Sequence, residues 1–285
     1  MLDRCDRVQV AVTDRKAVAE RYHRLLGAEI AREDRSAYLG AHRLVLAVGE
    51  SEIELVEPDG AGRTHDFLAR WGESIMTAGY STVDVAALAR RLDGLGVSYA
   101  HDGPQLHLGP PHTPGFPMVI TPSTYRVRVG LVSFLYETTS VLVTDWRRAA
   151  AAFTSLFDLD PTRFSKIGSK RFGYEGTLTL FDPPNRLDRI ELSQVTGPDS
   201  AMARFTRRRG GDGLYMAYIE THDWPGIRTR LLEAGAKWTP RGKDPATEPD
   251  GGWIHPRELG GLLLGVSRTG QAWEWSGRKD LVPPA

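Results

Sequence analysis

The sequence has a single cysteine, Cys5, among 285 residues. One cysteine excludes an intramolecular disulfide framework and any metal site that needs several thiolates, as is usual in a reducing cytoplasm. An excess of one charge is also missing, because 36 basic side chains face 36 acidic ones. No overall electrostatic field therefore favours nucleic acid or an anionic membrane as a partner.

Long hydrophobic runs are absent as well. The N-terminus, MLDRCDRVQV, carries charges where a signal peptide needs an apolar run. No stretch approaches the roughly 18 apolar residues of a membrane span. There is no phosphate-binding glycine loop, serine nucleophile motif or CxxC pair. We therefore expect a cytoplasmic protein, monomeric or homodimeric, that acts on a small molecule and binds neither nucleic acid nor membranes.

The sequence does contain a long internal repeat, which predicts its organisation. The segment VQVAVTDRKAVAERYHRLLGAEI (8–30) is matched by SVLVTDWRRAAAAFTSLFDLDPT (140–162), in an alignment that places Tyr22 on Phe153. Residues 53–96 likewise match residues 190–235. Two copies of one unit are therefore predicted, at residues 1–132 and 133–285.

Within each unit, the hydrophobic pattern predicts two modules of one strand, one helix and three strands (βαβββ). Residues 7–12 alternate as a strand, and Thr13 or Asp14 can cap a following helix with apolar residues at helical spacing. Residues 38–49 and 51–58 indicate strands, and residues 65–72 a short helix. A strand at 75–81 and a helix at 84–96 begin the next module.

These ordered segments, present twice, resemble the vicinal oxygen chelate superfamily, also called the glyoxalase and bleomycin-resistance fold. They are most similar in character to its methylmalonyl-CoA epimerase branch, and the resemblance covers nearly the whole chain. It implies an α+β fold in which four βαβββ modules form two cup-shaped mixed sheets. It also implies a divalent metal inside a cup, held by one side chain from each of four strands.

Most of the implied metal-ligand positions hold other residues. In the first cup these positions hold, in chain order, Arg7, Glu54 and Thr77. In the second cup they hold Thr138, Glu191, Met216 and Gly265. A single carboxylate per cup cannot hold a catalytic divalent ion, because such sites need three or more protein ligands. We therefore predict no metal and no other cofactor, which disfavours metal-dependent epimerase, glyoxalase and dioxygenase chemistry.

Arg7 and Glu54 suggest a structural role for the first cup. We expect the Arg7 guanidinium to lie where a metal would be and to pair with Glu54, so that neither charge is buried alone.

The second cup is the predicted site, with Glu191 on its inner face and Ile190 and Leu192 turned away. Thr138, Met216 and Tyr218 as neighbours would raise the pKa of Glu191 and make it a general base, assisted by Thr138 or Tyr218. The alternative is a Glu191 satisfied by hydroxyls or by an arginine. Met216, Tyr215 and Trp253 are the predicted substrate-binding residues.

Two further groups of residues leave alternatives open. His101, His107 and His112 either bind a metal or are simply solvated. The basic segments TRRRGG (206–211) and SKRFG (169–173) either receive a carboxylate, a phosphate or a coenzyme A tail, or lie in solvent.

Two function classes follow. The first is a metal-independent isomerase, epimerase, cyclase or lyase that moves a proton next to a carbonyl. The second is a non-catalytic protein that binds or sequesters a small molecule, like the bleomycin-resistance proteins. Loss of the metal ligands favours the binding protein, whereas the four modules and the inward-facing Glu191 favour the enzyme, which we take as the first hypothesis.

Overall fold

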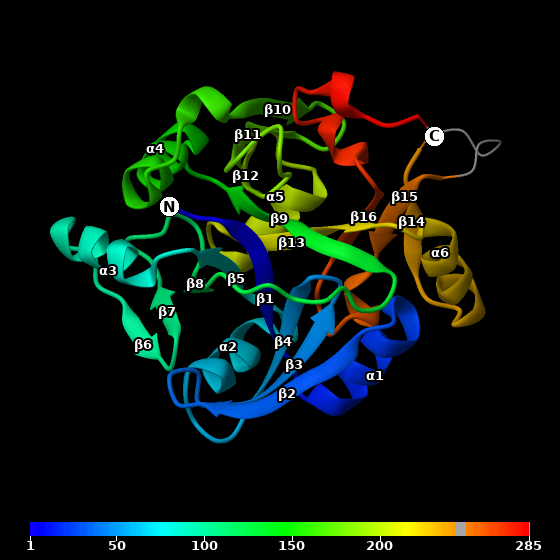
Figure 1. The fold of residues 1–285 in the computed structure, drawn as a ribbon, viewed down its shortest axis with the longest axis horizontal. Coiled ribbons are helices and arrows are strands. Elements are labelled where there is room, and N and C mark those ends of the chain that lie inside the picture. The colour runs from blue at the N-terminus through cyan, green and yellow to red at the C-terminus, as the bar shows by residue number, and fades with distance from the viewer. Residues whose placement is uncertain (243–248, 285) are drawn as a thin grey trace.

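The computed structural model describes residues 1–242 and 249–284 and contains two eight-stranded mixed sheets (Figure 1). The first has the spatial order β2 (Glu29–Ser36), β3 (Ala41–Val48), β4 (Ser51–Pro58), β1 (Arg4–Ala11), β5 (Ser74–Thr82), β8 (Met118–Pro122), β7 (Gln105–Leu108), β6 (Ala100–Asp102). The second has the order β10 (Ser165–Ser169), β11 (Tyr174–Leu180), β12 (Arg189–Val195), β9 (Val132–Leu142), β13 (Gly213–Thr221), β16 (Leu264–Arg268), β15 (Gly251–Ile254), β14 (Trp238–Pro240).

The helices connect the strands as the βαβββ pattern requires. They are α1 (Arg15–Leu26), α2 (Arg63–Trp71), α3 (Val85–Gly94), α4 (Trp146–Phe157), α5 (Ala201–Arg209) and α6 (Trp224–Glu233). Short 3₁₀ turns are η1 (Pro161–Arg163), η2 (Pro256–Glu258), η3 (Gln271–Trp273) and η4 (Lys279–Leu281). Side-chain caps define the starts of several helices, as where Asp14 accepts a hydrogen bond from the Ala17 amide of α1.

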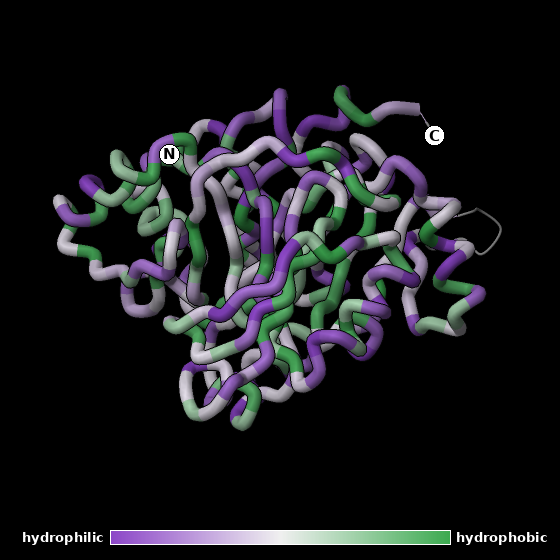
Figure 2. Tube along the Cα trace, turned by 60° about the horizontal axis from the view of Figure 1, so that its bottom comes forward, coloured by the Kyte–Doolittle hydropathy of each residue, from purple (hydrophilic) through white to green (hydrophobic). Residues whose placement is uncertain are grey.

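The two sheets share one hydrophobic core, which includes residues of both β1 and β9. Figure 2 shows how hydrophobic and hydrophilic residues are distributed along the chain. In β12, RIELSQV, they alternate, which gives this strand one polar and one apolar face. Helices α1 and α6 pack together at one end of the molecule, and α3 and α4 at the other (Figure 1). The first module of the chain therefore contacts the fourth, and the second module contacts the third.

Polar contacts also join the two sheets. The Tyr80 hydroxyl on β5 bonds to Thr138 on β9, and the Cys5 amide donates to the Asp188 carboxylate at 2.8 Å. The N-terminal ammonium of Met1 donates to the Phe157 carbonyl at 2.8 Å. The first two of these bonds are buried, and all three help to fix the two halves of the chain relative to each other.

The α+β fold predicted from the repeat, with four modules in two mixed sheets, is confirmed. Strand β2 was not predicted, because its sequence EIAREDRS lies on a sheet edge and is mostly exposed. Among the described residues, no helix has both the length and the apolar character that a membrane crossing requires.

Candidate active site

We call the face of each sheet that carries Glu54 or Glu191 its cup face. In the first sheet this face is filled by Arg7, which is 3% exposed. The Arg7 guanidinium contacts Glu54 at 2.7 Å, Glu52 at 2.8 Å and Asp6 at 3.2 Å. Its aliphatic part lies against Gly79, where a Cβ atom would be 1.9 Å from the Arg7 Cγ. Three carboxylates therefore balance the charge of Arg7, and the absence of a side chain at Gly79 leaves room for its aliphatic part.

Glu54 is fully buried and fully paired. Besides Arg7, it accepts bonds from Gln9 at 2.8 Å and Gln105 at 2.9 Å, and Arg43 lies 3.4 Å away. Burial alone would raise the pKa of Glu54, but the Arg7 and Arg43 charges and these hydrogen bonds lower it to about 2. A carboxylate held this firmly in its charged form has little capacity to accept a proton near neutral pH.

The cup face of the second sheet carries two glutamates, Glu137 on β9 and Glu191 on β12. Arg189, which is fully buried, donates to Glu137 at 2.6 Å and to the Ser276 hydroxyl at 2.7 Å. The Arg189 guanidinium thus provides the buried Glu137 carboxyl group with an ion-pair partner. Glu191, two residues further along β12, has no arginine within ion-pair distance among the described residues.

Hydroxyl groups surround Glu191. The Ser193 hydroxyl donates to it at 2.5 Å, and the Thr139 hydroxyl lies 3.3 Å from both Glu191 and Glu137. Burial, then the Glu137 charge and the hydrogen bond with Glu137, raise the pKa of Glu191 well above its ordinary value of 4.5. The two glutamates therefore form a carboxyl pair in which Glu191 is the member that holds a proton.

Tyr218 and Trp253 lie on the same cup face. The Trp253 indole donates to the Tyr218 hydroxyl at 3.0 Å, and the Tyr218 ring covers Gly265, where a Cβ would be 2.1 Å from ring carbons. Burial, then the charges of Glu191 and Glu137, raise the pKa of the Tyr218 hydroxyl well above its ordinary value. In the described part of the chain, the Tyr218 hydroxyl accepts this one bond and has no acceptor for its own proton.

Met216 is beside this group, because it lies opposite Thr139 in the register of β13 and β9. The C-terminal segment closes over the cup. Arg241 lies 4.4 Å from the Trp275 ring and 5.5 Å from the Trp253 ring, and Ser276 bonds to Arg189. Together these residues shield the carboxyl pair from solvent, and Glu191 is only 8% exposed.

The prediction that Thr138 lies beside Glu191 is wrong. In the parallel pair β9–β12, Glu191 is opposite Thr139 and Arg189 is opposite Glu137. Thr138 points to the other face and bonds to Tyr80. The corresponding pairs in the first sheet are Gln9 with Glu54 and Arg7 with Glu52, so Glu137, not Thr138, is the counterpart of Arg7.

The error comes from one additional residue between strand and helix. One residue, Thr13, separates Val12 from the helix cap Asp14, whereas Val143 and Thr144 separate Leu142 from the cap Asp145. An alignment anchored on the helix is therefore shifted by one on the strand, and a shift of one turns every side chain to the opposite face. The spacing of two between Arg189, Glu191 and Ser193 was the signal in the sequence that could have identified the missed residues.

Tyr215 is not in the second cup either. It is the additional residue of a β-bulge in β13 and packs edge-on against Phe205 of α5, with ring centroids 5.1 Å apart. It lines a separate cavity between the two units. Tyr215 therefore lies apart from Glu191, and its substrate-binding role stays a prediction.

The three histidines of residues 101–112 do not converge. His107 is buried in the first cup and stacks on Tyr38 with ring centroids 4.2 Å apart, and burial lowers its pKa to about 4. His101 is exposed beside Tyr99, and His112 contacts Ser98. Within the described residues, no three histidine, cysteine or acidic side chains are arranged to hold a metal ion.

The divalent metal that the fold implies does not fit the donors of either cup. The first cup already holds the Arg7 guanidinium among its carboxylates. In the second, Glu137 is bound to Arg189, and Met216, Tyr218 and Gly265 supply neither imidazole nor carboxylate. A site with one available carboxyl group lacks the three or more ligands that a catalytic metal needs.

Comparisons with known proteins agree with this architecture. Residues 4–108 match the model of the Glyoxalase/Bleomycin resistance protein/Dioxygenase superfamily. A triple mutant of 4-hydroxymandelate synthase from Streptomyces coelicolor superposes with a TM-score of 0.68 at 14% identity, covering 99% of this chain and 96% of that chain. A fusion of a xylose isomerase-like TIM barrel with 4-hydroxyphenylpyruvate dioxygenase gives a TM-score of 0.64 at 12% identity, covering 94% of this chain and 49% of that chain.

Methylmalonyl-CoA epimerase from Streptomyces coelicolor is 25% identical, with a TM-score of 0.39, and covers 44% of this chain and 99% of that chain. Because this alignment spans less than half of the chain, the similarity to the epimerase branch stays a prediction. No significant match was found among curated proteins. Residues 4–108 thus match the glyoxalase/bleomycin resistance protein/dioxygenase superfamily, and the chain as a whole shares the fold of these solved structures.

Proposed function

We propose that the protein is a metal-independent cytoplasmic enzyme that moves a proton next to a carbonyl group, as an isomerase, epimerase, cyclase or lyase does. The proposed site is the second cup, with Glu191 as the acid and base. The observation that carries this proposal is the buried carboxyl pair, in which Glu137 contacts Arg189 and Glu191 has a raised pKa. Strongly perturbed carboxyl groups are concentrated at catalytic sites.

Each group in the pair has a distinct chemical task. A glutamate with a raised pKa becomes a stronger base when it loses its proton, which brings it closer to the weakly acidic C–H bond beside a carbonyl. Within the described residues no acceptor takes the Tyr218 hydroxyl proton, which can therefore be donated to the carbonyl oxygen as negative charge develops there. The Trp253 indole bond fixes the orientation of that hydroxyl.

The surroundings of the pair suit such a reaction. Trp253, Trp275 and Met216 provide an apolar boundary, and the C-terminal segment keeps water away from Glu191. Exclusion of water strengthens the electrostatic interactions that a proton transfer uses. We infer that a substrate enters by displacing part of this segment. Entry would break the hydrogen bond between Ser276 and Arg189.

The proposal is tested by exchange of carbon-bound hydrogen for deuterium. Phenylpyruvate and propionyl-CoA are incubated with the protein in D₂O, and loss of the proton beside the carbonyl is followed by proton NMR. We expect catalysed exchange of at least one of them, reduced by about 100-fold or more in Glu191→Gln, within the usual range for loss of a general base.

The matched control is Glu220→Gln. Glu220 is also a buried glutamate with a raised pKa, but it accepts a bond from the Gly270 amide and does not contact the carboxyl pair. This variant should retain exchange. Binding of a probe without any exchange by the wild-type protein would instead favour the second function class, a non-catalytic small-molecule binding protein.

A further inference from the structure

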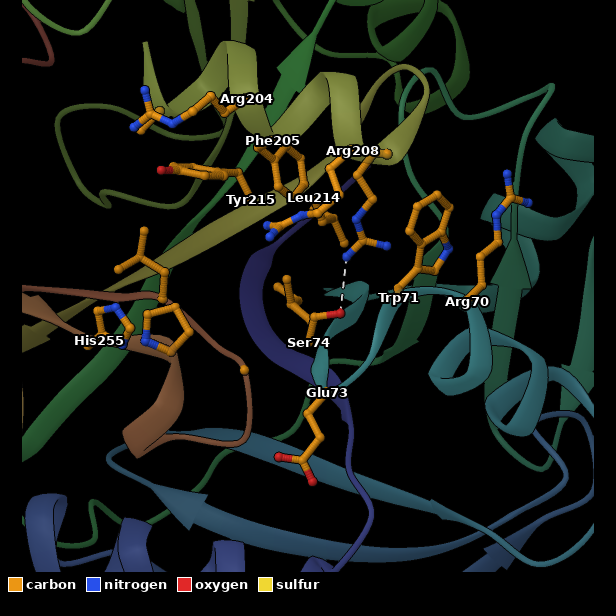
Figure 3. A pocket seen from close by; sticks show the side chains of 16 residues that line it. Arg70, Trp71, Glu73, Ser74, Arg204, Phe205, Arg208, Leu214, Tyr215 and His255 are labelled. Atoms are coloured by element: carbon orange, nitrogen blue, oxygen red, sulfur yellow. Dashed lines mark hydrogen bonds between the residues drawn. The ribbon is translucent and has the colours of Figure 1, made fainter. Parts of the chain in front are cut away.

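A cavity of about 670 Å³ lies between the two units (Figure 3). The first unit contributes the end of α2 and the start of β5, and the second contributes α5, the start of β13 and the turn at Pro256. No member of the carboxyl pair lines it. Its volume is within the range of sites that bind small organic molecules.

Four arginines line this cavity, in a protein whose overall charge is zero. They are Arg70 at the end of α2 and Arg204, Arg208 and Arg209 of α5. In the described residues, neither Arg208 nor Arg209 has a carboxylate within ion-pair distance. By contrast, the buried arginines Arg7, Arg43 and Arg189 each contact at least one acid.

Arg209 is the least exposed of the four. Among the described residues, its guanidinium donates one hydrogen bond, to the Ser74 hydroxyl of the first unit at 3.1 Å. Burial, then the neighbouring Arg208 charge, lower the pKa of Arg209 to about 10. A guanidinium carries five N–H donors, so Arg209 has donors to spare and would be stabilised by an anion that reached it.

Aromatic rings form the walls around this charge. The Arg209 guanidinium lies 4.7 Å from the Trp71 ring, 5.2 Å from the Phe67 ring and 5.3 Å from the Phe205 ring. Tyr215 continues the wall beside Phe205. Rings in these positions fix the plane of the guanidinium and offer flat apolar surface to a ligand.

The one acidic side chain in the lining, Glu73, is already used. It accepts bonds from the Thr13 amide at 2.8 Å and the Thr13 hydroxyl at 2.5 Å. Figure 3 shows its carboxylate pointing away from Arg208, on the far side of Ser74. Glu73 therefore does not neutralise the arginines.

We propose that this cavity binds an aromatic anion, whose carboxylate or phosphate is held by Arg208 and Arg209 and whose ring lies against Trp71, Phe205 and Tyr215. Two guanidinium groups with unused donors match the planar oxygen pairs of such anions. Because Ser74 and Trp71 belong to the first unit and α5 to the second, the ligand contacts both units.

The test uses isothermal titration calorimetry with three naphthalene probes. 1-Naphthoate and 1-naphthyl phosphate distinguish the two anionic groups, and neutral 1-naphthalenemethanol has the same ring without charge. We expect at least one anion to bind at least ten-fold more tightly than the alcohol, with affinity that falls as salt concentration rises.

The variants Arg208→Ala and Arg207→Ala form a matched pair. Both remove an exposed arginine from α5, but Arg207 does not line the cavity and its guanidinium bonds to the Pro198 carbonyl at 2.5 Å. We expect Arg208→Ala to weaken anion binding ten-fold or more and Arg207→Ala less than two-fold.

A third variant, Arg209→Lys, keeps a positive charge in the aromatic cage but loses the planar donor pair. We expect it to weaken binding more than Arg207→Ala while the fold, followed by circular dichroism, stays intact. Equal losses in Arg207→Ala and Arg208→Ala would overturn the proposal, since binding would then depend on general charge. Equal affinity for the anions and the alcohol, or no binding of any anion, would overturn it too.

Discussion

Glu54 and Glu191 are at the same position in the two sheets, yet their pKa values are displaced in opposite directions. Each lies on the strand that pairs in parallel with the first strand of its unit, opposite Gln9 in one case and Thr139 in the other. Glu54 has Arg7 and Arg43 beside it, which lower its pKa to about 2. Glu191 has Glu137 beside it, and its pKa is raised. Position in the fold alone therefore does not determine the chemistry of the cup.

The first prediction is that Glu191 makes the folded protein less stable as pH rises. A group whose pKa is raised on folding stabilises the folded state fully below its unfolded value, 4.5 for glutamate, and this stabilisation is lost as pH rises through the folded value. Glu191→Gln removes the titration. The free energy of unfolding of this variant should therefore increase relative to wild type between pH 5 and pH 8, as measured by urea denaturation.

Glu54→Gln should behave in the opposite sense. The pKa of Glu54 is lowered to about 2, so its stabilisation is present above 4.5 and is lost as pH falls towards 2. The variant should be clearly destabilised at pH 7 and should lose less stability than wild type on acidification. If both variants had the same pH dependence relative to wild type, the contrast between the two cups would be wrong.

The second prediction concerns Arg7. Arg7→Met leaves the carboxylates of Asp6 and Glu54 buried without their main cation and should lower the free energy of unfolding by about 3–5 kcal/mol. The control is Arg32→Met, because Arg32 also contacts Glu52, at 2.7 Å, but its side chain is 41% exposed. The control should cost about 1 kcal/mol or less. Similar costs for the two variants would contradict a structural role for the first cup.

The third prediction separates Thr138 from Thr139. Thr138→Val removes the partner of the buried Tyr80 hydroxyl and should cost about 1–3 kcal/mol, with no change in the titration of Glu191. Thr139→Val removes a hydroxyl that bonds to Glu191 and should raise the pKa of Glu191 further. Carbon-13 NMR of labelled glutamate side chains measures that titration, and the reverse assignment of effects would restore the original alignment.

The fourth prediction concerns the close approach of Tyr218 to Gly265. An alanine Cβ at residue 265 would lie 2.1 Å from the tyrosine ring, so Gly265→Ala should cost about 1–3 kcal/mol from overpacking. Gly197→Ala is the control, because a Cβ there meets no atom within 4 Å. Combining Gly265→Ala with Tyr218→Ala should recover part of the loss, and strict additivity of the two changes would show that the residues do not interact.

The sequence predicted the fold well because the internal repeat preserved both the order and the hydrophobic spacing of the elements. It predicted the candidate site less well because successive side chains of a strand point to opposite faces. One additional residue before Asp145 shifted the alignment by one, so Thr138 was predicted on the cup face in place of Glu137 and Thr139. The charge state of Glu191 depends on Glu137 and Arg189, and the contact between these residues arises only from strand pairing. The cavity between the units brings together segments more than a hundred residues apart, and local patterns do not record such contacts.

The ion pairs Arg7–Glu52 and Glu137–Arg189 join equivalent strand pairs, but the basic and acidic residues have exchanged strands. In the first, the cation is on the first strand of the unit, and in the second it is on the partner strand. A symmetric dimer of one repeated unit could not carry both arrangements, because every substitution would appear in both halves. Joining two units in one chain frees each position from its counterpart, so one half can keep its charges locked while the other acquires a carboxyl group able to exchange a proton.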